Sequence, residues 1–413
     1  MNETGQLSIE KLQEELSLKK LQMNSLLAIT QAINDNVAAP ELYNMYKSFI
    51  GWEMGIKRMA LFFRQDDLWQ CTTHLLADNL AMREDLGPIL KRYVKRQWIT
   101  EADPEPLQGF DLIIPVYHKK NPIAFGLVGG IRPDMDEYNQ IQFITTITNI
   151  IAVAIENKRL FKRQIEQERF ARDMELASSV QQMLIPDHLP KSRYFEMASV
   201  YKPHFTVGGD YFDFIQYDER RLTFCIADIS GKGVSAAILM ANFQAILQSL
   251  IYQYRDLETF VFALNEAVYR ITRSDRFITL FIGELNLHTN TLQYINAGHF
   301  PPFLIQNGQI TRLESGCTII GAFDTLPEIH MGEVKLTHPG IIFACTDGLT
   351  DVVNELDQYF DDTQLEDILE RADPSTSAEK INAELMRRVD QFRGSRSYPD
   401  DIALLTCKFT PGK

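Results

Sequence analysis

Apolar residues near the N-terminus recur every three or four positions, which predicts a helix with one apolar stripe. The stripe is interrupted by Lys19 and comprises Ile9, Leu12, Leu16, Met23, Leu26 and Thr30. A short heptad pattern of this kind either packs against its own domain or pairs with a second copy of the chain. We expect an N-terminal helix over residues 1–26, with packing and self-pairing both open.

Residues 27–157 change to an α+β pattern. The helical stretch LYNMYKSFIGWEM precedes segments of alternating polarity, among them FDLIIPVYHKKNPIAFGLVGG, in which HKKNP joins two strands. A long helical segment follows from Asp136. Helix, antiparallel strands, late hairpin and exit helix in this order resemble a GAF sensor domain. The resemblance implies an α/β/α fold and does not indicate a ligand.

The exit helix carries apolar residues whose heptad phase shifts along its length. The residues in question are Ile144, Ile147, Ile151, Ala154, Phe161, Ile165, and then, in the shifted phase, Phe170, Met174, Ala177 and Leu184. A phase shift of this kind is a stutter in a coiled coil, along which a structural change can travel. A plain packed helix remains the alternative. We expect a helical linker over residues 158–190, with the helix stopped near Leu184 by Pro186 and Pro190.

Residues 191–413 alternate in polarity over many short segments, interrupted by two pairs of helical stretches. The first pair runs from Val234 to Thr272, and the second lies in LEDILERA and SAEKINAELMRRVDQF. Hairpin turns separate several of the predicted strands, and Asn307-Gly308 is the strongest turn signal. Adjacent hairpins predict antiparallel sheets, and paired helices predict outer layers. The expected fold is an α/β/β/α sandwich.

Composition and charge narrow the class of protein. The chain of 413 residues has a net charge of −14, which argues against a nucleic-acid-binding protein. Its five cysteines are scattered and form no CxxC pair, so zinc and disulfide frameworks are not expected. No apolar run approaches the roughly 20 residues that span a bilayer, and the polar N-terminus does not resemble a signal peptide. We expect a cytoplasmic protein that does not insert into a membrane.

Aspartates stand where predicted strands meet turns. The segments that contain them are VGGDYFDF, CIADISG, CTDGLTD and YPDDIAL, which place Asp210, Asp228, Asp347, Asp400 and Asp401. A single aspartate at such a place is usually a turn former or helix cap. Taken together, however, these carboxylates would repel one another unless a cation lay among them. Hard divalent ions such as Mg²⁺ and Mn²⁺ prefer oxygen ligands, and a pair of them supports displacement at phosphorus.

Five motifs in order, VGGDYFDF, ADISGKGVSAA, NAGHFPP, TDGLTD and DDIAL, resemble those of the metal-dependent PPM phosphatases. The similarity is to the bacterial SpoIIE and RsbU branch, which dephosphorylates phosphoserine or phosphothreonine on anti-sigma-factor antagonists. The resemblance implies two Mn²⁺ or Mg²⁺ ions as cofactors and a phosphorylated, STAS-type antagonist as partner. It also implies that water activated by the ions is the nucleophile, so that no Ser, Cys or His is needed for that role.

The resemblance assigns roles to particular residues. The implied ligands are Asp210, Asp228, Asp347 and Asp400, together with the backbone carbonyl of Ile229. Asp228 would bridge both ions, and Asp210 would reach them directly or through water; both would count as catalytic. The carbonyl of Ile229 would complete the site of one ion, and Asp347 and Asp400 would bind the other ion. Whether Asp400 or its neighbour Asp401 is the direct ligand stays open.

The chain also departs from the family pattern. Ser230 stands where eukaryotic relatives have a histidine proposed as general acid. His299 in NAGHFPP suits a structural hydrogen-bonding role better than a catalytic one. Lys232 is either a contact for substrate phosphate or a solvated loop lysine. The acidic segment DVVNELDQYFDD replaces the usual glycine-containing flap, so substrate preference does not carry over.

These observations predict a metal-dependent protein serine/threonine phosphatase in bacterial signalling, controlled by an N-terminal sensor. Its homodimer would form through the N-terminal and linker helices, and changes in linker packing would move the helix at Val234. The first alternative is a catalytically silent module that binds a phosphoprotein through the same fold. The clustered aspartates argue against it, because a silent copy has no chemical need for them. A metal phosphodiesterase acting on nucleotides is a second alternative.

Overall fold

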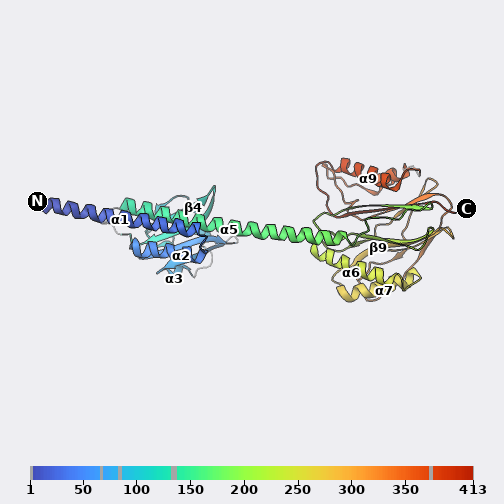
Figure 1. The fold of residues 1–413 in the computed structure, drawn as a ribbon, viewed down its shortest axis with the longest axis horizontal. Helices are drawn as coiled ribbons and strands as arrows, with labels where there is room; N and C mark the ends of the chain where they lie inside the picture. The colour runs from blue at the N-terminus through green and yellow to red at the C-terminus, as the bar shows by residue number, and fades with distance from the viewer. Residues whose placement is uncertain (1–2, 66–67, 82–85, 132–136, 372–374, 413) are drawn as a thin grey trace. The chain divides into compact units, whose positions relative to one another are not determined.

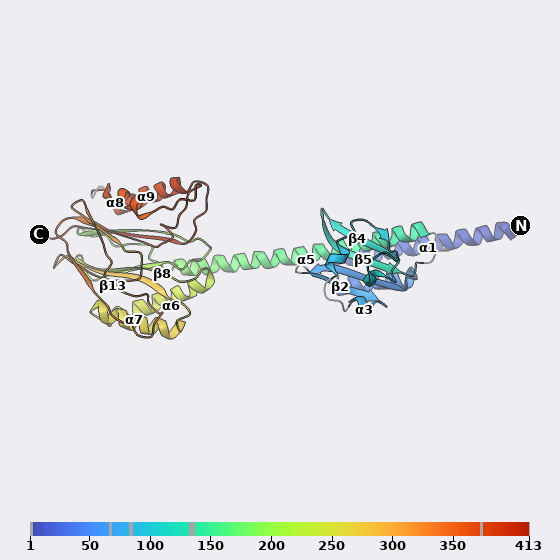
Figure 2. The same ribbon diagram turned by 180° about the vertical axis from the view of Figure 1, so that it is seen from behind.

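The computed structural model describes residues 3–65, 68–81, 86–131, 137–371 and 375–412. The chain forms two compact units, Met1–Arg169 and Phe170–Lys413. Figures 1 and 2 show both units from opposite sides. Within the described residues, no helix combines the length and the apolar character that crossing a membrane would require.

The N-terminal unit is built on a five-stranded sheet in the order β2-β1-β5-β4-β3, with antiparallel neighbours throughout. The strands are β1 (Arg58–Gln65), β2 (Leu68–Leu75), β3 (Gln97–Trp98), β4 (Leu112–His118) and β5 (Asn121–Gly129). The helical elements are α1 (Glu3–Asn34), α2 (Ala39–Ser48), the π-helix η1 (Phe49–Glu53), α3 (Asp78–Ala81), α4 (Gly87–Leu90), the 3₁₀-helix η2 (Glu105–Leu107) and α5 (Glu137–Gln182). The HKKNP turn prediction is confirmed, because His118 pairs with Asn121 across two turn residues.

Both faces of this sheet are buried. Along β1, Met59, Leu61 and Phe63 pack with residues of α1, α2 and α5, whereas Ala60 and Phe62 pack against the opposite layer, which contains α3 and α4. This period of two is the alternation that the sequence shows for a strand covered on each side. The helices on one face and the short helices and loops on the other form an α/β/α arrangement.

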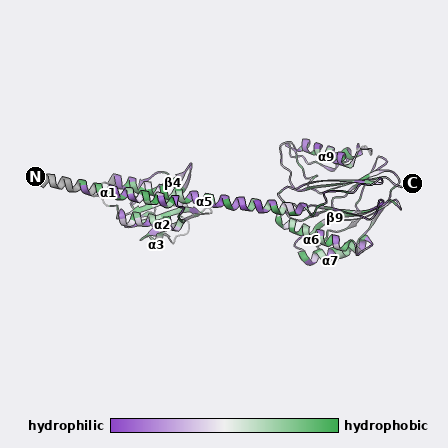
Figure 3. Cartoon of the chain, in the orientation of Figure 1, coloured by the Kyte–Doolittle hydropathy of each residue, from purple (hydrophilic) through white to green (hydrophobic). Residues whose placement is uncertain are grey.

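Helix α5 runs unbroken from Glu137 to Gln182; Asp136, where the sequence predicted it to begin, lies outside the described residues. Hydrophilic residues predominate along its middle in Figure 3. Phe161 and Phe170 are each 64 % exposed there, so part of the predicted heptad seam faces solvent. The helix ends two residues before the expected Leu184, ahead of Pro186.

The C-terminal unit stacks two sheets between two pairs of helices (Figures 1 and 2). The first sheet contains β7 (Tyr211–Gln216), β8 (Arg221–Ile229), β9 (Ile278–Asn286), β10 (Thr291–Ala297), β13 (Gly316–Cys317) and β14 (Gly332–Lys335). The second contains β6 (Phe195–Lys202), β11 (Phe303–Gln306), β12 (Gln309–Arg312), β15 (Gly340–Cys345) and β16 (Ile402–Phe409). The helices are α6 (Val234–Leu250), α7 (Leu257–Thr272), α8 (Asp362–Glu370) and α9 (Ala378–Arg393).

Three layers of buried residues hold this sandwich together. One lies between the first sheet and α6 with α7, one between the sheets, and one between the second sheet and α8 with α9. The predicted α/β/β/α sandwich is therefore present. The Asn307-Gly308 turn is also confirmed: it joins β11 to β12, and both residues have positive φ (53° and 71°), as a two-residue hairpin of type I′ requires.

Candidate active site

Strand ends bring the five aspartates to one edge of the sandwich. Asp210 directly precedes β7, and Asp228 lies near the end of β8, which is antiparallel to β7. Asp347 follows β15, and Asp400 and Asp401 precede β16, which is antiparallel to β15. Antiparallel neighbours place the start of one strand beside the end of the next, so each sheet contributes its carboxylates at a single edge.

A buried threonine joins the two sheets at this edge. Thr346 donates its hydroxyl hydrogen to Asp210 Oδ2 over 2.7 Å, and its Oγ accepts from the backbone N–H of Ala403 over 2.9 Å. Thr346 and Asp210 are 1 % and 2 % exposed. Because both bonds are buried, they fix Asp210 of the first sheet relative to the start of β16 in the second.

Asp401 is occupied by the backbone of the loop before Asp210. Its Oδ1 accepts from the N–H of His204 (2.7 Å) and its Oδ2 from the N–H of Gly209 (2.6 Å). The close approach of the Asp401 carboxylate to the loop requires glycine at position 208, because a Cβ there would lie 2.6 Å from Asp401 Oδ2. Asp401 therefore shapes the loop, while the neighbouring Asp400 is directed elsewhere.

The same loop is held from the other side by Gln181 in the last turn of α5. The Gln181 amide donates from Nε2 to the carbonyl of Gly208 (2.6 Å), and its Oε1 accepts from the N–H of Gly208 (3.1 Å). Gln181 is 6 % exposed. The sequence patterns predicted neither Gln181 nor Thr346 as part of the site. Thr346 stands inside the TDGLTD motif directly before Asp347, whereas no spacing signal links Gln181 to a loop 27 residues later.

The carboxylates perturb one another. Burial, and then the charge of Asp228, raises the pKa of Asp210 well above its usual value. Burial and the charges of Asp347 and Asp400 raise the pKa of Asp228 to about 7. The pKa of Asp347 is also raised, by burial of its carboxyl and then by Asp351, although the residue as a whole is exposed. The edge therefore gathers more negative charge than its own surroundings neutralise.

This donor set has the chemistry that Mg²⁺ or Mn²⁺ requires, namely several carboxylate oxygens at an open edge. The carbonyl oxygen of Ile229 adds a further donor type, and a Cβ on Gly209 would lie 2.9 Å from it. A cation would relieve the repulsion that raises the carboxyl pKa values. Within the described residues, however, no three Asp, Glu, His or Cys side chains are already drawn together as ligands of one ion.

Lys232 provides a positive charge at the outer side of the cluster. Its ammonium lies 2.6 Å from Asp400 Oδ2 and 3.3 Å from the carbonyl of Pro399, and the bond to Asp400 raises the lysine pKa. The lysine side chain is half exposed. Lys232 thus contacts a candidate ligand in addition to solvent.

His299 and Ser230 take part in the interior framework. The Nδ1 of His299 shares a hydrogen bond with Thr279 Oγ1 (2.9 Å), and burial lowers the pKa of His299 to about 4, so the ring is neutral at pH 7. Ser230 accepts through Oγ from the N–H of Phe277 (2.9 Å) and through its carbonyl from Arg276 (3.2 Å). These contacts fix the end of β8 behind Asp228.

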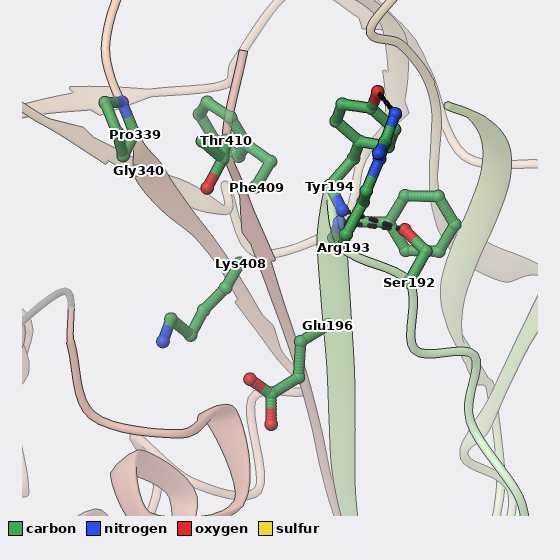
Figure 4. A pocket seen from close by; sticks show the side chains of 10 residues that line it. Ser192, Arg193, Tyr194, Glu196, Pro339, Gly340, Lys408, Phe409 and Thr410 are labelled. Atoms are coloured by element: carbon green, nitrogen blue, oxygen red, sulfur yellow. Dashed lines mark hydrogen bonds between the residues drawn. The ribbon is translucent and has the colours of Figure 1, made fainter. Parts of the chain in front are cut away.

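A separate pocket of about 140 Å³ lies at the other end of the second sheet. Figure 4 shows Lys408 and Glu196 among its lining residues. Residues 195 and 409 pair at that end of β6 and β16, whereas residues 202 and 402 pair at the end next to the aspartates. The pocket of Figure 4 is therefore distinct from the candidate active site.

Comparison with known proteins finds similarity in the C-terminal half of the chain. Residues 218–410 match the family described as Stage II sporulation protein E (SpoIIE). The chain is 27% identical over 172 residues to phosphoserine phosphatase RsbU of Bacillus subtilis, covering 41% of this chain and 49% of the relative. It is 23% identical over 279 residues to protein IcfG of Synechocystis, covering 60% of this chain and 43% of the relative. The chain thus spans less than half the length of each.

A solved structure shows the same fold. The SiaA-PP2C domain of Pseudomonas aeruginosa superposes with a TM-score of 0.53 at 19% identity, covering 59% of this chain and 98% of that domain. At this identity the likeness concerns the fold alone. The C-terminal unit therefore has a PP2C fold, and across residues 218–410 its sequence is similar to the SpoIIE family.

Proposed function

We propose that the C-terminal unit is a metal-dependent phosphatase that hydrolyses phosphoserine or phosphothreonine on a partner protein. The observation that carries the proposal is the gathering of aspartates at one edge, where burial and mutual repulsion raise the pKa values of Asp210, Asp228 and Asp347. Similarity to a phosphoserine phosphatase in the matching region supports the same reaction.

In this proposal two divalent ions supply electrostatic stabilisation at the phosphoryl group and activation of water. Asp210, Asp228, Asp347, Asp400 and the carbonyl of Ile229 would hold them. Asp401 and Thr346 keep the edge in shape by fixing the Gly209 loop and Asp210. Lys232 orients Asp400 through their 2.6 Å ion pair. His299 is not an imidazolium acid at neutral pH, because burial lowers its pKa to about 4 and the ring is neutral.

The substrate and its control are proposed from the relatives and from the architecture. Similarity to phosphoserine phosphatase RsbU, together with the motif resemblance to the SpoIIE and RsbU branch, supports a phosphorylated STAS-type anti-sigma-factor antagonist as partner. The five-stranded antiparallel sheet of the N-terminal unit, covered by helices, supports a GAF-like sensor. Exposed Phe161, Ile165 and Phe170 on α5 support a homodimer through the linker helices.

The test is hydrolysis of a phosphoserine peptide with and without Mn²⁺, comparing wild type with Asp228→Asn and Asp347→Asn. We expect kcat/KM to fall by about 100-fold or more in each variant, as when groups that position transition-state charge are removed. Asp367→Asn is the matched control, because Asp367 pairs with Arg371 on the surface of α8. Folding is checked in parallel by thermal denaturation without metal.

The outcomes separate the proposal from its alternatives. Metal-dependent activity that is lost in both variants and retained in the control supports a phosphatase. Wild type that binds the phosphopeptide but does not hydrolyse it with Mn²⁺ or Mg²⁺ would indicate a silent phosphoprotein-binding module. Hydrolysis of cyclic nucleotides in preference to the peptide would indicate a phosphodiesterase.

A further inference from the structure

A basic pocket of about 580 Å³ lies within the N-terminal unit, on elements that bear none of the five aspartates. Four cationic side chains and one carboxylate are among its lining residues, in a chain whose net charge is −14. The charged residues are Arg64, Lys119, Glu156, Arg159 and Arg163. The volume is within the usual range for a small-molecule site. We propose that this pocket binds a small organic molecule through a phosphate group.

Three separate segments supply the positive charge. Arg64 lies near the end of β1, Lys119 in the turn between β4 and β5, and Arg159 and Arg163 one turn apart on α5. Residues four apart lie on the same face of a helix, and both arginines line the pocket from that face of α5. Charges brought together from three segments repel one another, and an anion between them removes that cost.

Arg159 is held in place by a neighbouring carbonyl, and its Nε is buried. Its guanidinium donates through Nη1 to the carbonyl of Arg64, and its Nε lies 3.8 Å from Glu156 Oε2, too long for a hydrogen bond. Within the described residues, this Nε is buried without a hydrogen-bond partner. A planar guanidinium fixed by its neighbours is suited to bidentate contact with phosphate oxygens.

The turn at Lys119 is a second, independent observation. Lys119 is the first of two residues joining β4 to β5, and its φ is 58°, a region that glycine or asparagine favours in such turns. A non-glycine residue in a sparsely populated conformation is retained more readily when its side chain has a role. Here the strained backbone carries an ammonium group at the pocket.

Apolar residues complete the pocket and indicate the organic part of the ligand. Ile123 is 8 % exposed and Leu160 41 % exposed, and both line the same space as the cations. Inorganic phosphate alone would leave this apolar surface uncovered. The shared chemistry is thus a phosphate group with an organic body, supplied either by a free phosphorylated metabolite or by the head group of an anionic phospholipid.

Calorimetric titration of the full chain with pyrophosphate, in EDTA and at fixed ionic strength, tests the site. We expect saturable binding that weakens by about tenfold or more in Arg159→Gln/Arg163→Gln, which lacks two charged donors to phosphate. Lys162→Gln is the control: it removes one positive charge from the same helix, but Lys162 is 80 % exposed and does not line the pocket. Equal binding by wild type and the double variant would overturn the proposal.

Lys119→Gly keeps the proposal testable if the arginine variants fold poorly. Glycine adopts a φ of 58° without strain, so we expect unchanged or higher thermal stability together with weaker pyrophosphate binding. Normal binding by this variant would show that the lysine has no part in the site. Asp228→Asn should bind pyrophosphate as wild type does, so loss of the phosphatase and loss of this site are distinguishable.

Flotation with phosphatidylglycerol and phosphatidylcholine vesicles separates the two sources of phosphate. Saturable pyrophosphate binding without flotation indicates a free small molecule. Flotation with phosphatidylglycerol alone, lost in Arg159→Gln/Arg163→Gln and kept in Lys162→Gln, indicates a lipid head group. Absence of both binding and flotation would refute the site.

Discussion

Replacing Gln181 by alanine tests whether the end of α5 holds the loop that carries Asp210. The substitution removes both hydrogen bonds to Gly208, of 2.6 and 3.1 Å, at a side chain that is only 6 % exposed. Each buried backbone group left without a partner costs about 1–3 kcal/mol of stability. A water molecule that enters the space left by the side chain can replace part of the lost hydrogen bonding. We therefore expect the free energy of unfolding to fall by about 2–4 kcal/mol.

The loss should be visible in two measurements. For a unit of this size, each kcal/mol lowers the melting temperature by about 2–4 °C, so thermal denaturation should resolve the change. Gly209 lies next to Gly208 and donates to Asp401, so greater motion of the loop should extend to the aspartates. Calorimetry should therefore show weaker Mn²⁺ binding. Gln182→Ala is the control, because the neighbouring Gln182 is exposed.

The pattern of results distinguishes anchoring from bulk stability. Lower melting temperature together with weaker Mn²⁺ binding, seen in Gln181→Ala only, supports the anchor. Lower melting temperature with unchanged Mn²⁺ affinity would show that Asp401 alone holds the loop. Variants of Gln181 and Gln182 that behave alike would refute the reasoning.

Three further outcomes follow from the C-terminal unit. Asp213 on β7 is buried, and burial raises the pKa of its carboxyl, so wild type loses stability as the pH rises above about 4, the usual pKa of an aspartate. Denaturation curves should show that the stability of Asp213→Asn relative to wild type increases as the pH rises from there, and a constant difference would contradict this. Lys232→Met removes the ammonium beside Asp400, and calorimetry should show tighter Mn²⁺ binding by about two- to fivefold, the worth of a half-exposed ion pair; weaker binding would show that Lys232 assists the metal. Gly348→Ala places a Cβ 1.8 Å from the carbonyl oxygen of Asp401, so we expect a lower melting temperature and loss of Mn²⁺ binding; normal binding would show that this turn is not required.

The sequence predicted those parts of the molecule that local pattern determines. Alternating polarity identified the long strands, and the Asn307-Gly308 turn identified the β11–β12 hairpin. The short strands β13 (Gly316–Cys317) and β14 (Gly332–Lys335) were missed, because four residues or fewer show no period of two. The π-helix η1 was read as ordinary helix, since nothing in its composition separates the two.

In the candidate site, too, local pattern predicted some residues, whereas contacts between distant segments determine others. Asp210 and Asp228 were predicted to converge because each stands where an apolar strand meets a turn, and in the structure the charge of Asp228 helps to raise the pKa of Asp210. Their anchors were not predictable, because Gln181 and Thr346 act through contacts between segments distant in sequence. The basic pocket was missed for the same reason: its cations come from three segments, and only the fold brings Arg64 to the helix.

The helix α5 contains residues of both proposed sites, and this allows a test of communication that rests on both proposals. Arg159 lines the pocket and Gln181 holds the Gly208 loop, on one continuous helix. Coupling between two sites is reciprocal. A ligand that changes the affinity for Mn²⁺ by some factor therefore has its own affinity changed by Mn²⁺ by the same factor. We expect pyrophosphate to shift the Mn²⁺ dissociation constant of wild type by about fivefold or more, the lower range of such couplings, when the constant is expressed in free Mn²⁺ because pyrophosphate itself chelates the ion. The shift should disappear in Gln181→Ala, because the helix then lacks its bonds to the loop. A shift that persists in Gln181→Ala would mean that coupling does not run through this contact, and equal dissociation constants with and without pyrophosphate in wild type would show that the two sites act independently.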